Sequence, residues 1–203
     1  MSYRLPAELI RDSALKLAGL LDPAVGGPSV KTGDFGHKSG DDQSREVDPV
    51  SLRRALYTYI QRTAPPPFLL TFDATSRERC IVQREITNTP LQSLILLNDS
   101  LFNLAARQMA RNEISNRELS PTTRLQRLFR KAMSRRASDE ETAALERFYH
   151  SQLERFEADL EAATIYLNIA EDSANTAENT PQWAAMSAVA NAILSLDETI
   201  TKR

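Results

Sequence analysis

All six glycines of this 203-residue chain lie between residues 19 and 40, so residues 41–203 contain none. Glycine supplies the backbone clearance that phosphate-binding loops and nucleophile elbows require. The glycine-free part therefore holds no Gly-x-Gly-x-x-Gly loop, no Walker loop and no Gly-x-Ser-x-Gly turn. The residues themselves identify no reaction, but they predict an organisation along the chain and a fold.

Composition excludes several classes of protein. The chain is 41% hydrophobic and 26% charged, with a formal net charge of −2, which argues against overall attraction to nucleic acid or anionic membranes. One cysteine and two histidines exclude a disulfide framework, a four-ligand zinc site and covalently attached c-type haem. No apolar run approaches the roughly 20 residues of a membrane-spanning helix.

Helix-start signals recur along the chain. A polar cap followed by proline, or a capping box, satisfies the free amides of a first helical turn. The spacing predicts a first helix that ends at Asp22-Pro23 and a second that runs from Asp48 to Ile60. Further starts are expected at Thr89-Pro90 with Gln92 completing a capping box, Ser120-Pro121, Ser138 with Glu141 completing a second box, and Thr180-Pro181.

We therefore expect an all-α fold, an irregular multi-helix bundle that forms a single domain over residues 1–203. Residues 22–48 hold five of the six glycines and should form a long glycine-rich loop after the first helix. Residues 65–88 should form a mostly irregular, extended, proline-rich arm, in which Phe68 to Phe72 is either a short strand or a buried segment. Asn98-Asp99-Ser100 should kink a helix or cap a new one.

The densest group of polar residues lies between residues 72 and 98. An arginine and an aspartate beside a capped helix start could bind a carboxylate or a phosphate. The same residues could form a buried network that fixes an irregular arm against helices, which is the interpretation we favour. The candidate polar cluster consists of Asp73, Arg77, Arg84, Thr89, Gln92 and Asn98.

The segment from Arg107 to Arg136 is strongly basic, with nine arginines and lysines against two glutamates. It could form a phosphate-binding face for nucleic acid. Alternatively, its arginines flank an apolar helical stripe and pair with the acidic helix that follows Ser138. Aromatic residues are absent apart from Phe129, which weakens the case for binding single strands, and we favour the structural interpretation.

The cysteine and the histidines suggest no catalytic group. Arginines beside Cys80 could activate its thiol, but burial beside Ile81 and Val82 as a small hydrophobe is the favoured interpretation. His150 is flanked by Glu146 and Glu154 at i±4 and could join a metal site, although no matching pattern occurs on another helix. A solvated face is favoured there, and His37 in the glycine-rich loop has no evident partners.

The run from Arg54 to Phe102 reads RALYTYIQRTAPPPFLLTFDATSRERCIVQREITNTPLQSLILLNDSLF. It closely resembles the signature of a planctomycete domain of unknown function that follows cytochrome c-like domains in large envelope proteins. Ile10 to Val30 and Trp183 to Lys202 are similar to that family's start and end. Ser100 stands where the family usually has proline, and Asp73-Ala74-Thr75 departs from its Asp-Ala-Pro run.

The resemblance implies a C-terminal module of a longer protein, located in the periplasm or cell envelope. It implies cytochrome c-like or other upstream domains as partners, and haem on such a domain rather than in this chain. No catalytic residue carries over. We expect a non-catalytic interaction or structural module whose Arg-rich face would make association salt-sensitive. The alternatives are part of a redox or hydrolytic enzyme completed by upstream domains and, more weakly, nucleic-acid binding by the Arg-rich helices.

Overall fold

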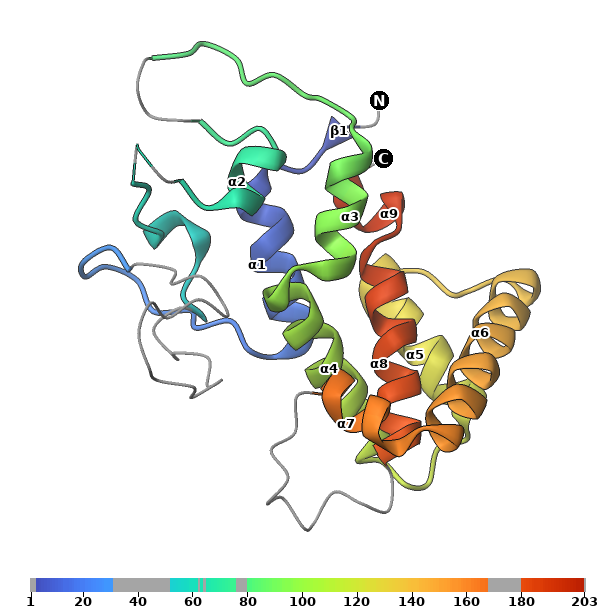
Figure 1. Cartoon of the computed structure of the whole chain (residues 1–203). Coiled ribbons are helices and arrows are strands. Elements are labelled where there is room, and N and C mark those ends of the chain that lie inside the picture. The colour runs from blue at the N-terminus through green and yellow to red at the C-terminus, as the bar shows by residue number, and fades with distance from the viewer. Residues whose placement is uncertain are drawn as a thin grey trace.

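The fold is all-α, as predicted, with one two-stranded sheet among the residues that the computed structural model describes, which are 3–30, 52–61, 63, 65–75, 80–167 and 180–202. Figure 1 shows the arrangement of the helices. The elements are β1 (Tyr3–Arg4), α1 (Ala7–Ala18), the 3-10 helix η2 (Ala55–Tyr57), α2 (Pro67–Thr71), α3 (Pro90–Asn98), α4 (Ser100–Ile114), α5 (Pro121–Met133), α6 (Asp139–Ala158), α7 (Leu160–Leu167), α8 (Thr180–Leu194), α9 (Asp197–Ile200) and β2 (Thr201–Lys202).

Helix α8 lies at the centre of the bundle, in contact with α4, α5, α6 and α7 (Figure 1). Its sequence is apolar on every side, which is the pattern of a fully buried helix. Ala184, Ala185 and Ala190 are completely buried, and such small side chains allow neighbouring helices to approach closely. The Trp183 indole donates a hydrogen bond to the Arg107 carbonyl of α4 at 2.9 Å, which fixes the two helices relative to each other.

The helix starts predicted at Thr89-Pro90, Ser120-Pro121, Ser138 and Thr180-Pro181 are confirmed, because α3, α5, α6 and α8 begin there. Ser120 caps α5 by accepting a hydrogen bond from the Thr123 amide. Ser138 and Glu141 form the predicted capping box, with Glu141 accepting from the Ser138 amide at 2.8 Å. Of the predicted kink or cap at Asn98-Asp99-Ser100, the structure shows the cap. Asp99 follows the end of α3, and its carboxylate accepts a hydrogen bond from the Leu101 amide at the start of α4.

The first helix ends earlier than the sequence suggested. Gly19 adopts a left-handed conformation, with φ of +76°, and its amide bonds to carbonyls of the last turn of α1. The prediction that Asp22-Pro23 stops the helix is therefore wrong, because this glycine cap acts first. The stretch from Phe68 to Phe72 is largely buried, as one of the two alternatives expected, but it is not extended, because α2 forms over Pro67–Thr71.

The predicted helix from Asp48 to Ile60 does not form over its described part, residues 52–60, and its start lies outside the described residues. A 3-10 turn occupies Ala55–Tyr57, while the backbone around it pairs with the segment before residue 31. The Val30 amide donates to the Tyr57 carbonyl at 2.8 Å, and the Tyr59 amide donates to the Val30 carbonyl at 2.7 Å. These distant partners replace the bonds that a helix would have made.

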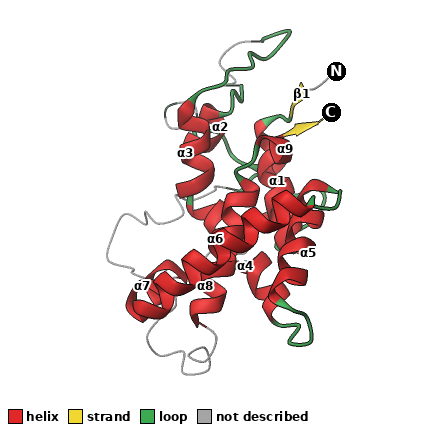
Figure 2. Ribbon diagram, turned by 90° about the vertical axis from the view of Figure 1, so that its right-hand side faces the viewer, coloured by secondary structure: helices red, strands yellow, loops and turns green. Residues whose placement is uncertain are grey.

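The two ends of the described chain meet in the small sheet (Figure 2). β1 and β2 are antiparallel, with Tyr3 opposite Lys202 and Arg4 opposite Thr201. The Leu5 amide adds a hydrogen bond to the Ile200 carbonyl at 2.8 Å. Arg4 is thereby held beside α2 and α3, two helices that are distant from it in sequence. No described helix is both long and apolar enough to cross a membrane.

A buried carboxylate joins α4 to α5. The Glu113 side chain is only 1% exposed, and it pairs with Arg127 at 2.8 Å and with Lys131. Both cations are about half exposed, so water offsets part of the electrostatic gain that the ion pairs provide.

We predict that Glu113→Gln lowers the free energy of unfolding by about 1–3 kcal/mol, because two charge-assisted contacts are lost at a buried position. Chemical denaturation followed by circular dichroism measures the change. Glu118→Gln, at an exposed position in the turn between α4 and α5, is the control and should shift stability by less than about 0.5 kcal/mol. Equal effects from the two variants would contradict the assignment.

Candidate functional site

A polar network joins three segments that are distant in sequence. Arg4 comes from β1, Asp73 follows α2, and Thr87 and Gln92 lie just before and within α3. We call these four residues the Arg4 network. Asp73 has a φ of +59°, a left-handed conformation that turns the chain after α2. This turn brings the Asp73 carboxylate to the Thr87 amide and the Arg4 guanidinium.

Hydrogen bonds link all four members of the Arg4 network. The Thr87 amide donates to Asp73 Oδ2 at 2.9 Å, and the Thr87 hydroxyl donates to Asp73 Oδ1 at 2.9 Å. Arg4 donates to Asp73, to the Thr87 carbonyl and, at 3.0 Å, to Gln92 Oε1. The Gln92 amide group donates to the Thr71 carbonyl at 2.9 Å. Both Asp73 oxygens are therefore already engaged by other residues of the chain.

The predicted capping box at the start of α3 is wrong. Thr89 occupies the cap position, but its side chain makes no capping hydrogen bond. Gln92 is instead buried, only 4% exposed. Its side-chain oxygen accepts a hydrogen bond from Arg4, and its side-chain nitrogen donates one to the Thr71 carbonyl. Tertiary partners thus compete successfully with the local motif.

The electrostatics of Asp73 disfavour a role in proton transfer. Burial alone would raise its pKa, but hydrogen bonds from the Thr87 amide, the Arg4 guanidinium and the Thr87 hydroxyl together hold the pKa below its usual value. A carboxylate of this kind stays ionised at neutral pH and serves as an electrostatic anchor. A general base would need a pKa closer to the operating pH.

The other members of the predicted polar cluster do not join the Arg4 network. Arg84 forms a two-pronged ion pair with Glu8 of α1, at 2.7 and 3.0 Å. Asn98 donates to the Leu94 carbonyl within its own helix. Arg77 lies outside the described residues. Of the five predicted residues that the structure describes, it brings together Asp73 and Gln92 alone.

Two important partners were missing from the prediction. Arg4 and Glu8 lie near the start of the chain, and no local pattern connects them with Asp73 or Arg84. Arg4 is 69 residues from Asp73, and Glu8 is 76 residues from Arg84. Only the pairing of the chain ends and the packing of α1 bring them together.

The Arg-rich segment is largely engaged within the protein. Arg135 binds Glu141 and Glu198, both at 2.7 Å through Nη2. The hydrogen bonds that Glu141 accepts from Arg135 and from the Ser138 amide lower the pKa of Glu141 to about 2. Arg107 donates to the Tyr166 carbonyl, and Arg124 donates to the Asn116 carbonyl. This pattern favours the structural interpretation. The acidic helix α6, which follows Ser138, pairs with only some of these arginines and lysines. Arg127 and Lys131 pair instead with Glu113 of α4.

The remaining candidates offer no reactive centre among the described residues. Cys80 is exposed, so the prediction that it is a buried hydrophobe is wrong, and Val82 beside it is fully exposed. His150 is exposed on α6, and Glu146 accepts a hydrogen bond from Thr122. His37 lies outside the described residues. No group of three or more metal-binding side chains occurs in the part of the chain that the structure describes.

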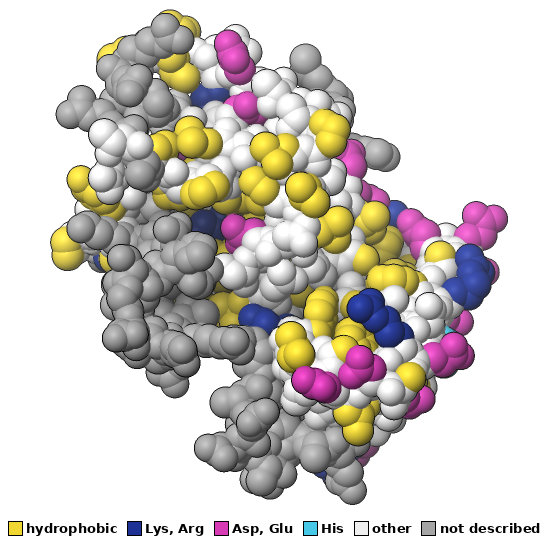
Figure 3. Space-filling model, viewed as in Figure 1, with side chains coloured by type: hydrophobic (Ala, Val, Ile, Leu, Met, Phe, Trp, Pro, Cys, Tyr) yellow, Lys and Arg dark blue, Asp and Glu magenta, His cyan; other side chains and the backbone are white. Residues whose placement is uncertain are grey.

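An apolar surface was also missing from the prediction. Leu91, Leu94 and Leu97 lie on the outer side of α3 and are 52%, 56% and 45% exposed. We call these three residues the α3 leucine face. Leu70 of the adjacent α2 is exposed as well, and Figure 3 shows hydrophobic side chains gathered over these two helices. The signal was present in the sequence, because residues 90–98 contain no charged residue.

A model of the PSD1 family, described as protein of unknown function (DUF1553), matches residues 1–149, well over half of the chain. No curated protein matches the chain, and no solved structure matches it. The matched region contains the Arg4 network and the α3 leucine face, whereas α8 lies beyond it.

We predict that Asp73→Asn lowers stability at neutral pH by about 1–2 kcal/mol, because the anionic partner of Arg4 is lost. The pKa of Asp73 is lower in the folded state than the ordinary aspartate value of 3.8, so its contribution to stability is full above that pH. The contribution is lost as the pH falls through the folded pKa. Urea titrations between neutral pH and pH 2.5 should therefore show that the free energy of unfolding falls less steeply with acid in the variant than in the unmodified chain.

Glu154→Gln is the control for that titration, because Glu154 is exposed on α6. It should reproduce the acid dependence of the unmodified chain. An unchanged acid dependence in Asp73→Asn would show that Asp73 is not the anchor described above.

Proposed function

The chain belongs to the PSD1 family of proteins of unknown function (DUF1553), and we propose that it is a non-catalytic interaction module that binds another protein domain through the α3 leucine face. The observation that carries the proposal is three half-exposed leucines along one side of a helix without charge. The opposite side of α3 packs against the rest of the protein, with Leu96 and Gln92 buried. A rigid helix thus presents the leucines outward.

Exposed leucine side chains have a driving force for association. Full burial of one leucine is worth about 1.5–3 kcal/mol, so covering three half-exposed leucines supplies roughly 2–4 kcal/mol. Contiguous apolar surface of this kind marks interaction sites more often than single scattered hydrophobic residues do. Leu70 on the neighbouring α2 extends the apolar area beyond one helix.

The resemblance to domains that follow cytochrome c-like domains suggests the partner. We propose a c-type haem domain of a longer envelope protein, whose contact surface is apolar where it meets α3. Because α3 carries no charge and most of the Arg-rich segment is engaged internally, association should depend only weakly on salt. This proposal differs from the expectation drawn from the sequence, in which an Arg-rich face made the association salt-sensitive.

The Arg4 network supports the non-catalytic part of the proposal. In an enzyme completed by upstream domains, Asp73 and Gln92 would need free hydrogen-bonding capacity toward a substrate. Asp73 accepts from Arg4 and Thr87, and Gln92 bonds to Arg4 and the Thr71 carbonyl. Releasing any of them would cost stability, which favours a structural role.

We predict that Leu94→Glu weakens binding to a recombinant c-type haem domain at least tenfold, because a charge then lies in an apolar contact. The melting temperature should change by less than about 3 °C, because Leu94 is more than half exposed in the free chain. Isothermal titration calorimetry at low and high salt measures the affinity.

Ile165→Glu on α7 is the matched control, since Ile165 is 68% exposed on a different helix. It should leave the affinity unchanged. Equal losses from both variants, or binding that disappears at high salt, would contradict docking through the α3 leucine face.

A further inference from the structure

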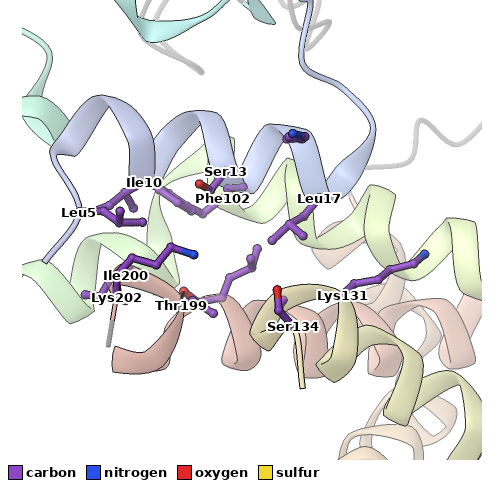
Figure 4. A pocket seen from close by; sticks show the side chains of 14 residues that line it. Leu5, Ile10, Ser13, Leu17, Phe102, Lys131, Ser134, Thr199, Ile200 and Lys202 are labelled. Atoms are coloured by element: carbon purple, nitrogen blue, oxygen red, sulfur yellow. Dashed lines mark hydrogen bonds between the residues drawn. The ribbon is translucent and has the colours of Figure 1, made fainter. Parts of the chain in front are cut away.

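A cavity of about 480 Å³ opens between α1, the end of α5, and the C-terminal α9 and β2 (Figure 4). Its volume falls within the roughly 300–1,000 Å³ range of small-molecule sites. The cavity lies apart from the α3 leucine face, and no residue of α3 lines it. A ligand in this cavity would therefore not overlap the proposed docking surface.

The lining of the cavity combines an apolar floor with positive charge. Eight of its residues are hydrophobic, including Ile10, Leu17 and Phe102, and these can hold an alkyl chain. Its charged residues are lysines, with no carboxylate among the lining residues. Every lysine that the structure describes lines this one cavity: Lys16, Lys131 and Lys202.

The three lysines are not equally available. Lys131 is paired with the buried Glu113. Lys202 belongs to β2, and the pairing of β2 with β1 fixes its backbone opposite Tyr3. In Figure 4 its amine reaches over the cavity, and it forms no ion pair with any residue that the structure describes. Lys16 on α1 also forms no ion pair with a described residue, so Lys16 and Lys202 are both available to an anion, and Lys202 is the one that Figure 4 shows extending over the cavity.

Hydroxyl groups complete the polar side of the cavity. Ser134 ends α5 in a left-handed conformation, with φ of +59°, and in Figure 4 its oxygen points into the cavity. Among the described residues, neither Ser134 nor Ser13 uses its hydroxyl in a hydrogen bond. Thr199 already donates to the Leu194 carbonyl at 2.9 Å. The two serines thus remain as donors for a ligand.

We propose that this cavity binds a medium-chain alkyl carboxylate. The alkyl chain lies on the apolar floor between α1 and α9, and the carboxylate accepts hydrogen bonds from Lys202 and from the serine hydroxyls. An amphipathic monoanion matches both halves of the lining. A neutral alcohol satisfies only the apolar half, and an alkyl ammonium is repelled by the lysines.

The test is calorimetric titration of the full chain with decanoate, decanol and decylammonium, each below its aggregation concentration. Decanoate should bind saturably with one site, about tenfold more tightly than decanol, with no detectable binding of decylammonium. Equal affinities for decanoate and decanol, or no saturable binding of decanoate, would overturn the proposal. This comparison needs no variant.

Variants locate the site. Lys202→Met should weaken decanoate binding about fivefold to tenfold and leave decanol binding unchanged, because only the charge contact is removed. Arg130→Met is the matched control, since Arg130 is exposed on α5 outside this cavity. Equal weakening by the two variants would mean that decanoate responds to general positive charge, which overturns the assignment.

Discussion

The close packing of α8 against α4 and α6 is the constraint on which the rest of the structure depends. Alanines at the contacts let the helices approach, and the Asn191 side chain adds hydrogen bonds to the Leu97 carbonyl at 3.0 Å and to Asn103 at 2.7 Å. Leu97 lies in the last turn of α3 and Asn103 in the first turn of α4, so one buried amide holds the junction between the two helices. The direction of α3, and with it the α3 leucine face, follows from that junction.

The charged residues of this chain act mainly to hold elements together. Glu113 joins α4 to α5, Arg135 joins the α5–α6 turn to α9, and Arg4 joins β1 to the segments around α2 and α3. Residues that would look catalytic in sequence are thereby occupied by internal partners. What remains uncommitted on α3 is apolar, and this contrast underlies the proposal of a docking module rather than a catalytic one.

Local signals predicted local structure well. Ser138 and Glu141 are three residues apart, so their capping box forms without help from the rest of the chain, and Ser120 caps α5 in the same way. The capping box predicted for Gln92 does not form, because Arg4, 88 residues away, binds the Gln92 side chain. The segment after residue 51 was predicted as helix because its apolar spacing fits one, but its backbone pairs with residues 22 and 30. Sequence spacing contains no information about such distant partners.

The central claim is that the α3 leucine face, and not the Arg-rich segment, meets a partner domain. Hydrogen–deuterium exchange of the chain, with and without a c-type haem domain, tests it most directly. Docking through the α3 leucine face should add protection over residues 90–98 and change exchange over residues 107–136 little. Protection confined to residues 107–136, with residues 90–98 exchanging as in the free chain, would contradict it.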